Sequence, residues 1–277
     1  MQLNLEQKKL ILMEPSGHIL IKGVAGSGKT TVAVHRMSYL MKRYCLEKDD
    51  KVLLVTFNKT LRNYIKYLYD KVDNLEDQTS INELLYTEGK GDIKTIDSIV
   101  YAYYRKCCSD TKIKVATSSD KFNLMSKAIH LFMEKYPAIK IINHKNAVFL
   151  IDEIEWIDAC LIETLEEYQQ VDRIGRATNV MQKTPHKLLK NSEIRSSIFK
   201  LKEIYQELMT KEKLTEFRML NKIALTAPVK KSETYTHIII DESQDLTKAQ
   251  LEMVKLIYKP KPYSSITFIA DNAQSIY

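Results

Sequence analysis

Two kinds of hydrophobic pattern run along this chain. Four short, β-branched runs lack polar alternation, which is typical of strands that are buried on both faces of a parallel sheet. They cover residues 19–21, 52–55, 237–240 and 266–270. Polar residues follow each run directly, and they include Gly or Asp after the runs at 19–21, 237–240 and 266–270. Because open α/β sheets bind ligands beyond the carboxyl ends of their strands, we expect the chemistry of this protein at one edge of one sheet.

The long stretch between the second and third runs has helical periodicity instead. Residues 59–69 carry apolar side chains at helical spacing, and two further stripes follow. These consist of Phe122, Met125, Ile129 and Met133, and of Ile151, Ile154, Ile157, Leu161, Leu165 and Tyr168 with acids on the opposite face. About 180 residues are too many for a crossover between strands, so we expect an inserted helical subdomain. The predicted division is 1–106 with 232–277 for the α/β domain and 107–231 for the insert.

The segment 23–30 reads Gly-Val-Ala-Gly-Ser-Gly-Lys-Thr and fits the phosphate-loop pattern G-x-x-x-x-G-K-[ST]. It lies between the first apolar run and a stretch of helical pattern, as this motif requires. Glycines let such a loop curl so that backbone N–H groups surround an anion, and the next helix adds the positive end of its dipole. We expect Lys29 to reach the β- and γ-phosphates of a nucleoside triphosphate and the Thr30 hydroxyl to bind Mg²⁺.

Two carboxylates, Asp241 and Glu242, end the third apolar run. Beside a phosphate loop, the first would hold Mg²⁺ and the second would polarise the attacking water. The fourth run delivers Asp271 and Gln274 to the same edge. A glutamine there can bond a γ-phosphate and lose that bond on hydrolysis, although an ordinary polar loop has the same composition.

The segment 3–7 carries Asn4 and Gln7 ahead of the first run. These side chains could read an adenine edge, and the plainer alternative is a helix N-terminus that Asn4 caps. The residues alone leave both interpretations open.

The net charge of +7 is distributed unevenly. Residues 148–170 contain seven acids and no Lys or Arg, whereas residues 171–231 contain 14 basic residues against 6 acidic ones. A basic block of this size can track a phosphate backbone, and it can equally be the solvated face of helices.

No run approaches the roughly 20 apolar residues that span a bilayer, and no signal peptide is evident. The four cysteines lack the spacing of a zinc site, so we expect a cytoplasmic protein with reduced thiols and no membrane partner.

Together these segments resemble the motifs of the UvrD/Rep family of superfamily 1 helicases, in the family's order and over residues 3–277. Motif Q matches Leu3, Asn4 and Gln7, motif I matches 23–30, motif II matches Asp241, Glu242, Gln244 and Asp245, and motif III matches Asp271 and 274–277. Motifs Ia and Ib resemble 56–59 and 95–99. The insert takes the place of the family's 1B subdomain, and 165–168 with 173–176 is similar to its E-Y-x(n)-R-x-G-R element.

The resemblance implies a RecA-like P-loop NTPase domain with a parallel sheet and an inserted all-helical subdomain, in a 3′-to-5′ DNA translocase that uses ATP and Mg²⁺. The implied catalytic residues are Glu242, Lys29 and Gln274, and the implied Mg²⁺ ligands are Thr30 and Asp241. The nucleotide would contact Gln7, Gly23, Ala25, Gly26, Ser27, Gly28, Lys29, Thr30 and Thr31. The nucleic acid would contact Phe57, Asn58, Lys59, Thr95, Ser98 and Tyr277.

The expected partners are single-stranded or duplex-junction DNA, with RNA as an open alternative, and a second, C-terminal motor domain. The sequence stops within motif III, so we expect this domain to supply the missing arginines of the ATP site. By itself the chain would bind ATP–Mg²⁺, hydrolyse it weakly and not unwind a duplex. Two departures from the family pattern are Asp97 in place of His and Ala270 in place of Gly.

Two other function classes fit the same motifs. One is a nucleotide-gated DNA-binding regulator or defence ATPase that never unwinds a duplex. The other is a P-loop ATPase that acts on protein partners, which predicts no salt-dependent affinity for oligonucleotides. The sequence gives no indication of oligomeric state.

Overall fold

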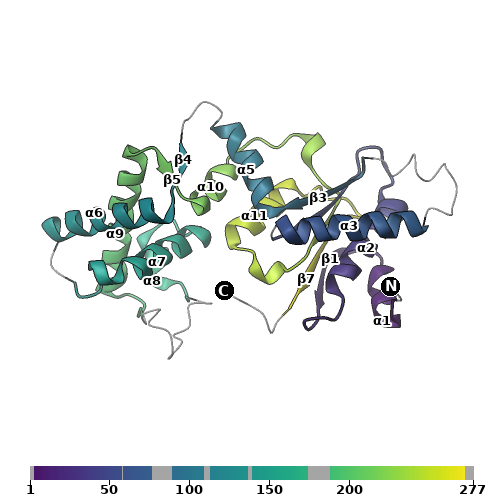
Figure 1. The fold of residues 1–277 in the computed structure, drawn as a ribbon, viewed down its shortest axis with the longest axis horizontal. Helices are drawn as coiled ribbons and strands as arrows, with labels where there is room; N and C mark the ends of the chain where they lie inside the picture. Colours follow the sequence, from purple (N-terminus) through teal and green to yellow (C-terminus); the bar gives the residue numbers. More distant parts are fainter. Residues whose placement is uncertain are drawn as a thin grey trace. The chain divides into compact units, whose positions relative to one another are not determined.

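The computed structural model describes residues 3–57, 59–76, 89–108, 113–136, 139–173 and 188–271 (Figure 1). They fall into two compact units, which we describe separately. The first is built on Met1–Tyr103, Pro228–Leu246 and Gln250–Ile276, and the second on Tyr104–Ala227 with Thr247–Ala249. Among the described residues, no helix combines the length and the apolar character needed to cross a membrane.

A parallel five-stranded sheet forms the centre of the first unit, in the strand order β1-β7-β6-β2-β3. Its strands are β1 (Gly17–Lys22), β2 (Val52–Thr56), β3 (Gly91–Thr95), β6 (His237–Ile240) and β7 (Ser265–Ala270). The four predicted runs are strands of this sheet, and the predicted α/β fold is confirmed. Every residue of β2 and β6 is buried, as expected for strands with neighbours on both sides.

The two edge strands differ from the sequence prediction. In β1, Ile21 is buried whereas Leu20 is 57% exposed. The prediction that this run is buried on both faces is therefore wrong. β1 lies at the edge of the sheet, and one of its faces is open. The hydrophobic pattern of the sequence does not show which strand lies at an edge. The sequence also failed to predict β3, because Gly-Asp-Ile-Lys-Thr is too polar to stand out. It forms by pairing in parallel with β2, and Gly91 lets it pack closely, since a Cβ there would lie 2.7 Å from Met37 Cε.

Helices cover the sheet and complete the core of the first unit. They are α1 (Leu5–Ile11), α2 (Lys29–Tyr44), α3 (Lys59–Glu76), α5 (Ile96–Cys107) and α11 (Lys248–Ile257), with 3₁₀ turns η2 (Lys231–Glu233) and η3 (Ser243–Asp245). α2 packs on β2 and β6, α3 packs on β2 and β3, and α1 packs on α2. Arg36 of α2 is fully buried and donates to the carbonyls of Leu10, Ile11 and Met13, which holds the end of α1 against the sheet unit.

The second unit is helical apart from one short ladder. Its helices are α6 (Ser118–Lys135), α7 (Ala147–Ala159), α8 (Leu165–Gln170), α9 (Glu193–Lys211) and α10 (Phe217–Ala224), with the 3₁₀ turn η1 (His144–Asn146). The parallel ladder joins β4 (Lys114–Val115) and β5 (Leu214–Thr215), which are too short to leave a sequence pattern. The C-terminal end of α5 also belongs to this unit.

The predicted apolar stripes are only partly correct. In α6, Met125 and Ile129 are fully buried, but Phe122 and Met133 are each 45% exposed because the buried face continues through neighbouring residues. These neighbours are Leu124, Ala128 and Phe132. The third stripe is not one helix: α7 ends at Ala159, and Leu161 has a φ of 54°, which breaks the helical path before α8 begins.

Candidate functional site

The loop after β1 leads directly into the N-terminus of α2. Gly26 and Gly28 have φ values of 77° and 82°, a region that residues with a Cβ seldom adopt. Gly28 is the N-cap residue of α2 and supplies no side-chain hydrogen bond to the helix. The first-turn N–H groups of a helix have no partner within the helix, and together with the helix dipole those of α2 can bind an anion. Ala25 and Ser27 are exposed on the loop, and Thr31 lies half-buried in the first turn.

Lys29, the first residue of α2, points back over this loop. Its Nζ atom donates to the carbonyls of Gly23 at 3.0 Å and Val24 at 3.1 Å. It also forms an ion pair with Asp271 Oδ2 at 3.2 Å, in which both side chains are largely buried. The ammonium group is thus held at the mouth of the anion site by acceptors that a phosphate could replace.

Thr30 and Asp241 meet across the sheet edge. The Thr30 hydroxyl donates to Asp241 Oδ2 at 2.8 Å, although the two residues are 211 positions apart in sequence. β6 brings Asp241 to this point, where the carboxylate is 1% exposed and its Oδ1 accepts the N–H of Glu242 at 3.1 Å. Burial raises the pKa of Asp241, and the Thr30 hydrogen bond opposes that rise. A bound cation would therefore stabilise the ionised form of this carboxylate.

A chain of hydrogen bonds links Glu242 to Asp271. Gln244 Nε2 donates to Glu242 Oε2 at 2.8 Å, and Gln244 Oε1 accepts the N–H of Asp271 at 3.1 Å. Glu242 itself has a φ of 53°, an unfavourable conformation for a residue with a Cβ and one that is often found at functional sites. Since the Asp271 carboxylate pairs with Lys29, the chain connects the third apolar run, the fourth apolar run and the loop.

Gln7 lies against the same loop. Its Nε2 donates to the carbonyl of Ser27 at 3.0 Å, while its Oε1 accepts the N–H of Asn4 at 3.0 Å. Asn4 in turn caps α1 by accepting the N–H of Gln7. The predicted helix cap is therefore confirmed, and the same glutamine reaches the loop. A Cβ on Gly28 would lie 2.6 Å from Gln7 Nε2, so a larger residue there would displace the Gln7 amide in addition to straining the backbone at positive φ.

Comparison with known proteins gives this geometry its context. The family model "UvrD/REP helicase N-terminal domain" matches residues 3–277. The chain belongs to the UvrD/REP helicase family. It is 24% identical to the ATP-dependent DNA helicase srs2 of Schizosaccharomyces pombe over 98% of the chain and 29% of that protein. It is 23% identical to the ATP-dependent DNA helicase Rep of Buchnera aphidicola subsp. Acyrthosiphon pisum over 100% of the chain and 38% of that protein.

A third relative is a probable DNA helicase II homolog of Mycoplasma genitalium, 21% identical over 99% of the chain and 36% of that protein. The chain thus spans about a third of the length of these relatives. The match covers the region that carries the family's motifs Q to III. It confirms the family that the motifs predicted.

The UvrD/REP motif Ia and Ib segments follow β2 and β3. Phe57 is half-buried after β2, and Lys59 is exposed at the start of α3. Thr95 is buried at the end of β3, where its hydroxyl accepts the N–H of Ser98 at 3.2 Å and its carbonyl accepts the Ser98 hydroxyl. The Thr95 side chain thus caps the first turn of α5, and Ser98 is the more accessible of the two.

Three predicted residues, Asn58, Gln274 and Tyr277, lie outside the described residues, so the structure places neither the motif III glutamine nor the aromatic. Asp97, the acid in motif Ib, accepts a hydrogen bond from Gln250 Nε2 of α11 at 3.3 Å. The Asp97 carboxylate therefore links α5 to α11 within the first unit.

Sequence reasoning missed several side chains near these motifs. Gln244 was matched to motif II but given no role, and only the fold brings its amide between Glu242 and Asp271. On α3, Tyr64 and Tyr67 are 48% and 54% exposed. They lie three residues apart on the face opposite the buried Ile65, which a helical projection of this segment could have shown.

Six basic residues of the block 171–231 contact acids or backbone carbonyls of the helical unit. Arg173 donates to the carboxylate of Glu153 with its side chain 7% exposed, so it serves an internal ion pair. Arg195 is buried and donates to the carbonyls of Val171 and Leu188. Further pairs join Lys190 to Asp172, Lys202 to Asp158, Arg218 to Glu155 and Lys222 to Glu163. Within the described part of the block, these contacts favour the interpretation that the basic residues stabilise the helical unit over the interpretation that they follow a phosphate backbone. Arg176 lies outside the described residues.

Proposed function

We propose that this chain is the ATP-binding N-terminal part of an ATP-dependent DNA helicase or translocase. The observation that carries the proposal is the bond between the Thr30 hydroxyl and the Asp241 carboxylate, next to Lys29 at the start of α2. A phosphate loop, a hydroxyl and a strand-end carboxylate that converge in this way are the parts that P-loop enzymes use for phosphoryl transfer. The relatives from Schizosaccharomyces pombe and Buchnera aphidicola are ATP-dependent DNA helicases, which agrees with this assignment.

Thr30 and Asp241 would hold Mg²⁺. The two groups are hard oxygen donors whose oxygens lie 2.8 Å apart, and such donors suit this ion. When bound, the ion neutralises charge that develops on the phosphate oxygens during transfer. Lys29 would exchange Asp271 and the loop carbonyls for the β- and γ-phosphates, and the first-turn N–H groups of α2 would complete the cradle.

Glu242 would accept a proton from the attacking water. Gln244 fixes the Glu242 carboxylate from one side and the backbone of Asp271 from the other, so it positions the base relative to motif III. Gln274, three residues after Asp271 in the sequence, would sense the γ-phosphate. Gln7 would read the adenine edge while its bond to Ser27 ties that recognition to the loop.

Single-stranded DNA would follow the carboxyl edge of the sheet, with a 3′-to-5′ direction by analogy with the family. Phe57, Asn58, Lys59, Ser98 and Tyr277 would contribute, whereas the capping contact of Thr95 leaves its hydroxyl little freedom to do so. We add Tyr64 and Tyr67 as stacking surfaces, because exposed aromatics beside basic residues suit unpaired bases. Lys59 and Lys66 are exposed on the same helix.

The division that we propose assigns residues 1–106 and 232–277 to the ATP-binding domain and 107–231 to the insert. The compact units support it, since their boundaries fall at residues 103/104 and 227/228. A second motor domain would supply arginines to the ATP site from across a cleft, an effect worth roughly 10³–10⁵ in rate in other phosphoryl-transfer systems. The chain alone would therefore bind ATP–Mg²⁺ and turn it over slowly.

The test uses the full-length protein and its Lys29→Ala variant. We expect the wild type to show ATPase activity that single-stranded DNA stimulates, to separate a duplex with a 3′ overhang, and to lose both activities in the variant. Retained hydrolysis in Lys29→Ala would refute the phosphate-loop assignment. Stimulation by DNA without strand separation would instead favour a nucleotide-gated regulator.

A further inference from the structure

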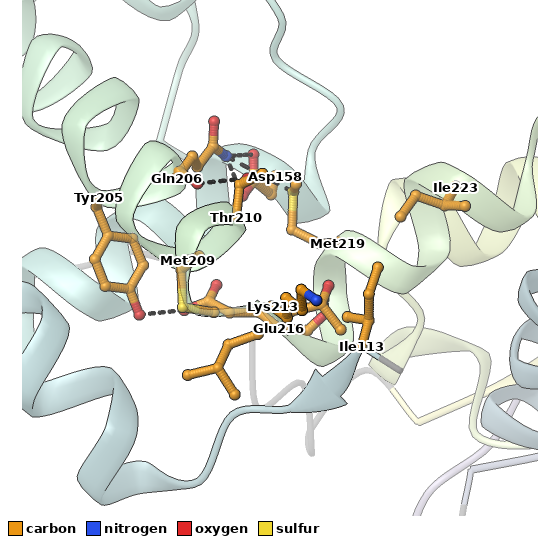
Figure 2. A pocket seen from close by; sticks show the side chains of 12 residues that line it. Ile113, Asp158, Tyr205, Gln206, Met209, Thr210, Lys213, Glu216, Met219 and Ile223 are labelled. Atoms are coloured by element: carbon orange, nitrogen blue, oxygen red, sulfur yellow. Dashed lines mark hydrogen bonds between the residues drawn. The ribbon is translucent and has the colours of Figure 1, made fainter. Parts of the chain in front are cut away.

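The helical unit encloses a cavity of about 640 Å³, between α9 and α10 and beside the β4–β5 ladder (Figure 2). This volume lies within the range of small-molecule sites. Met209, Met219 and Ile223 supply much of an apolar lining, and methionine side chains adapt readily to the shape of a ligand. The cavity belongs to the helical unit alone and includes no residue of the ATP site.

One buried carboxyl group faces this cavity without a cation. Glu216 lines the wall and is 2% exposed, and its Oε1 accepts the hydroxyl of Tyr205 at 2.7 Å (Figure 2). Within the described residues the neutral Tyr205 hydroxyl is its hydrogen-bond partner, and no ion pair involves it. A buried carboxylate without an opposite charge is costly, because burial removes its water.

The neighbouring acids are paired. Asp158, on the same wall, forms an ion pair with Lys202 at 3.3 Å and accepts Gln206 Nε2 at 3.1 Å. Glu155 pairs with Lys121 and Arg218. Lys213, which is exposed, also lines the cavity, and no ion pair joins it to Glu216. Of the two described acids in the lining, Asp158 therefore has an ion pair and Glu216 has none.

The pKa of Glu216 agrees with its lack of an ion pair. Burial raises the pKa of Glu216 to about 7; the Tyr205 hydrogen bond and the charge of Lys121 oppose the rise, and the charges of Glu155 and Asp158 add to it. A positive charge placed in the cavity would relieve the burial cost and the repulsion together. An anion would increase both.

We propose that this cavity binds a small organic cation, whose apolar body packs between Met209 and Met219 and whose ammonium group bonds Glu216. The site is independent of the proposed ATP chemistry. The ligand class follows from the combination of an apolar wall with one unpaired, buried carboxyl group. An amine on a drug-sized hydrocarbon frame meets both requirements.

Three indole compounds of nearly equal size test the charge requirement: tryptamine, tryptophol and indole-3-acetate. Isothermal titration calorimetry on the 277-residue chain at pH 8 should show tryptamine binding about tenfold more tightly than tryptophol, because a hydrogen bond to a charged group adds this much. Indole-3-acetate should bind most weakly. Lowering the pH to 6 should reduce the preference for tryptamine, because Glu216 then takes up a proton.

Two variants and a control separate this site from binding elsewhere. Glu216→Gln keeps an acceptor for Tyr205 and should bind tryptamine and tryptophol equally, whereas Glu163→Gln, which changes an exposed carboxylate of the same unit, should keep the tenfold preference. Thr210→Trp places bulk at the exposed rim and should abolish binding of all three compounds. Circular dichroism should confirm that each variant is folded.

The proposal fails if none of the compounds binds at millimolar concentration. It also fails if tryptamine and tryptophol bind the wild type equally, or if Thr210→Trp leaves their affinities unchanged. A tenfold preference that disappears in Glu216→Gln and persists in Glu163→Gln supports it.

Discussion

The carboxyl edge of the sheet, where we propose the ATP site, and the interior of the helical unit both bury carboxylates, but these carboxylates differ in their partners. Glu153 in α7 is fully buried and accepts the Tyr168 hydroxyl at 2.9 Å and Arg173 Nε at 2.8 Å. Asp241 is as deeply buried and has one hydroxyl and one backbone N–H, with a raised pKa that burial causes. Among the described residues, the first carboxylate forms an ion pair with Arg173, and no ion pair involves the second.

This difference distinguishes a structural acid from a binding acid. A buried charge that is paired inside the fold stabilises only if both partners stay in place. A buried charge that is left incompletely compensated costs stability, and such groups concentrate at functional sites. The comparison predicts that changes at Glu153 affect stability, and that changes at the sheet edge affect binding and catalysis.

The largest expected effect is on catalysis, through Glu242→Gln. Loss of the proposed base should lower kcat of the full-length protein by about 10²–10⁴-fold, the range for general-base catalysis, while ATP affinity changes little. Steady-state hydrolysis and fluorescent-nucleotide binding measure the two effects. Glu252→Gln, on the exposed side of α11, is the control and should leave both unchanged. A variant that loses ATP binding would contradict the role of Glu242 as base.

Next in size is the effect of Glu153→Ala on folding. Removing this carboxylate leaves Arg173 and the Tyr168 hydroxyl buried without their acceptor, which should lower the free energy of unfolding by about 3–5 kcal/mol. Chemical denaturation measures the change. Glu163→Gln, which removes an exposed partner of Lys222, should have little effect. Equal losses in the two variants would show that the buried network is not the cause.

A smaller effect is expected from Gly28→Ala, with Gly26→Ala as its matched control. Both glycines have positive φ, which should cost each variant about 1–2 kcal/mol. A Cβ at Gly28 also meets Gln7 Nε2 at 2.6 Å, whereas nothing lies within 4 Å of a Cβ at Gly26. Gly28→Ala should therefore cost about 1 kcal/mol more. Equal unfolding free energies would show that Gln7 does not pack on the loop.

The smallest effect is the pH dependence that Asp241 contributes. Because the pKa of Asp241 is raised in the folded state, that state holds the proton more tightly, and stability should fall as pH rises from about 4 through the elevated pKa. Asp241→Asn removes this contribution. The unfolding free energies of variant and wild type should diverge with rising pH in denaturant titrations without nucleotide. Parallel curves would indicate that the carboxylate is well compensated.

The sequence predicted the phosphate loop and the strand-end acids because both depend on local chemistry. Glycines, a lysine and a hydroxyl in fixed spacing between an apolar run and a helical stretch favour one kind of loop, and all of these lie within one short segment. It did not predict β3, whose polar residues become a strand only by pairing with β2. It also treated the stripe from Ile151 to Tyr168 as one surface, because periodicity does not show the turn at Leu161.

The sequence by itself determined the family, the α/β fold class, the identity of the loop and the acids that follow the buried strands. Each of these rests on residue types at short spacing or on runs of apolar residues, which one segment contains in full. Only the tertiary structure decided that Thr30 contacts Asp241, that Gln244 joins Glu242 to Asp271, and which acids the block 171–231 neutralises. These contacts join residues far apart in sequence or depend on side-chain directions, and strand order and helix packing bring their partners together.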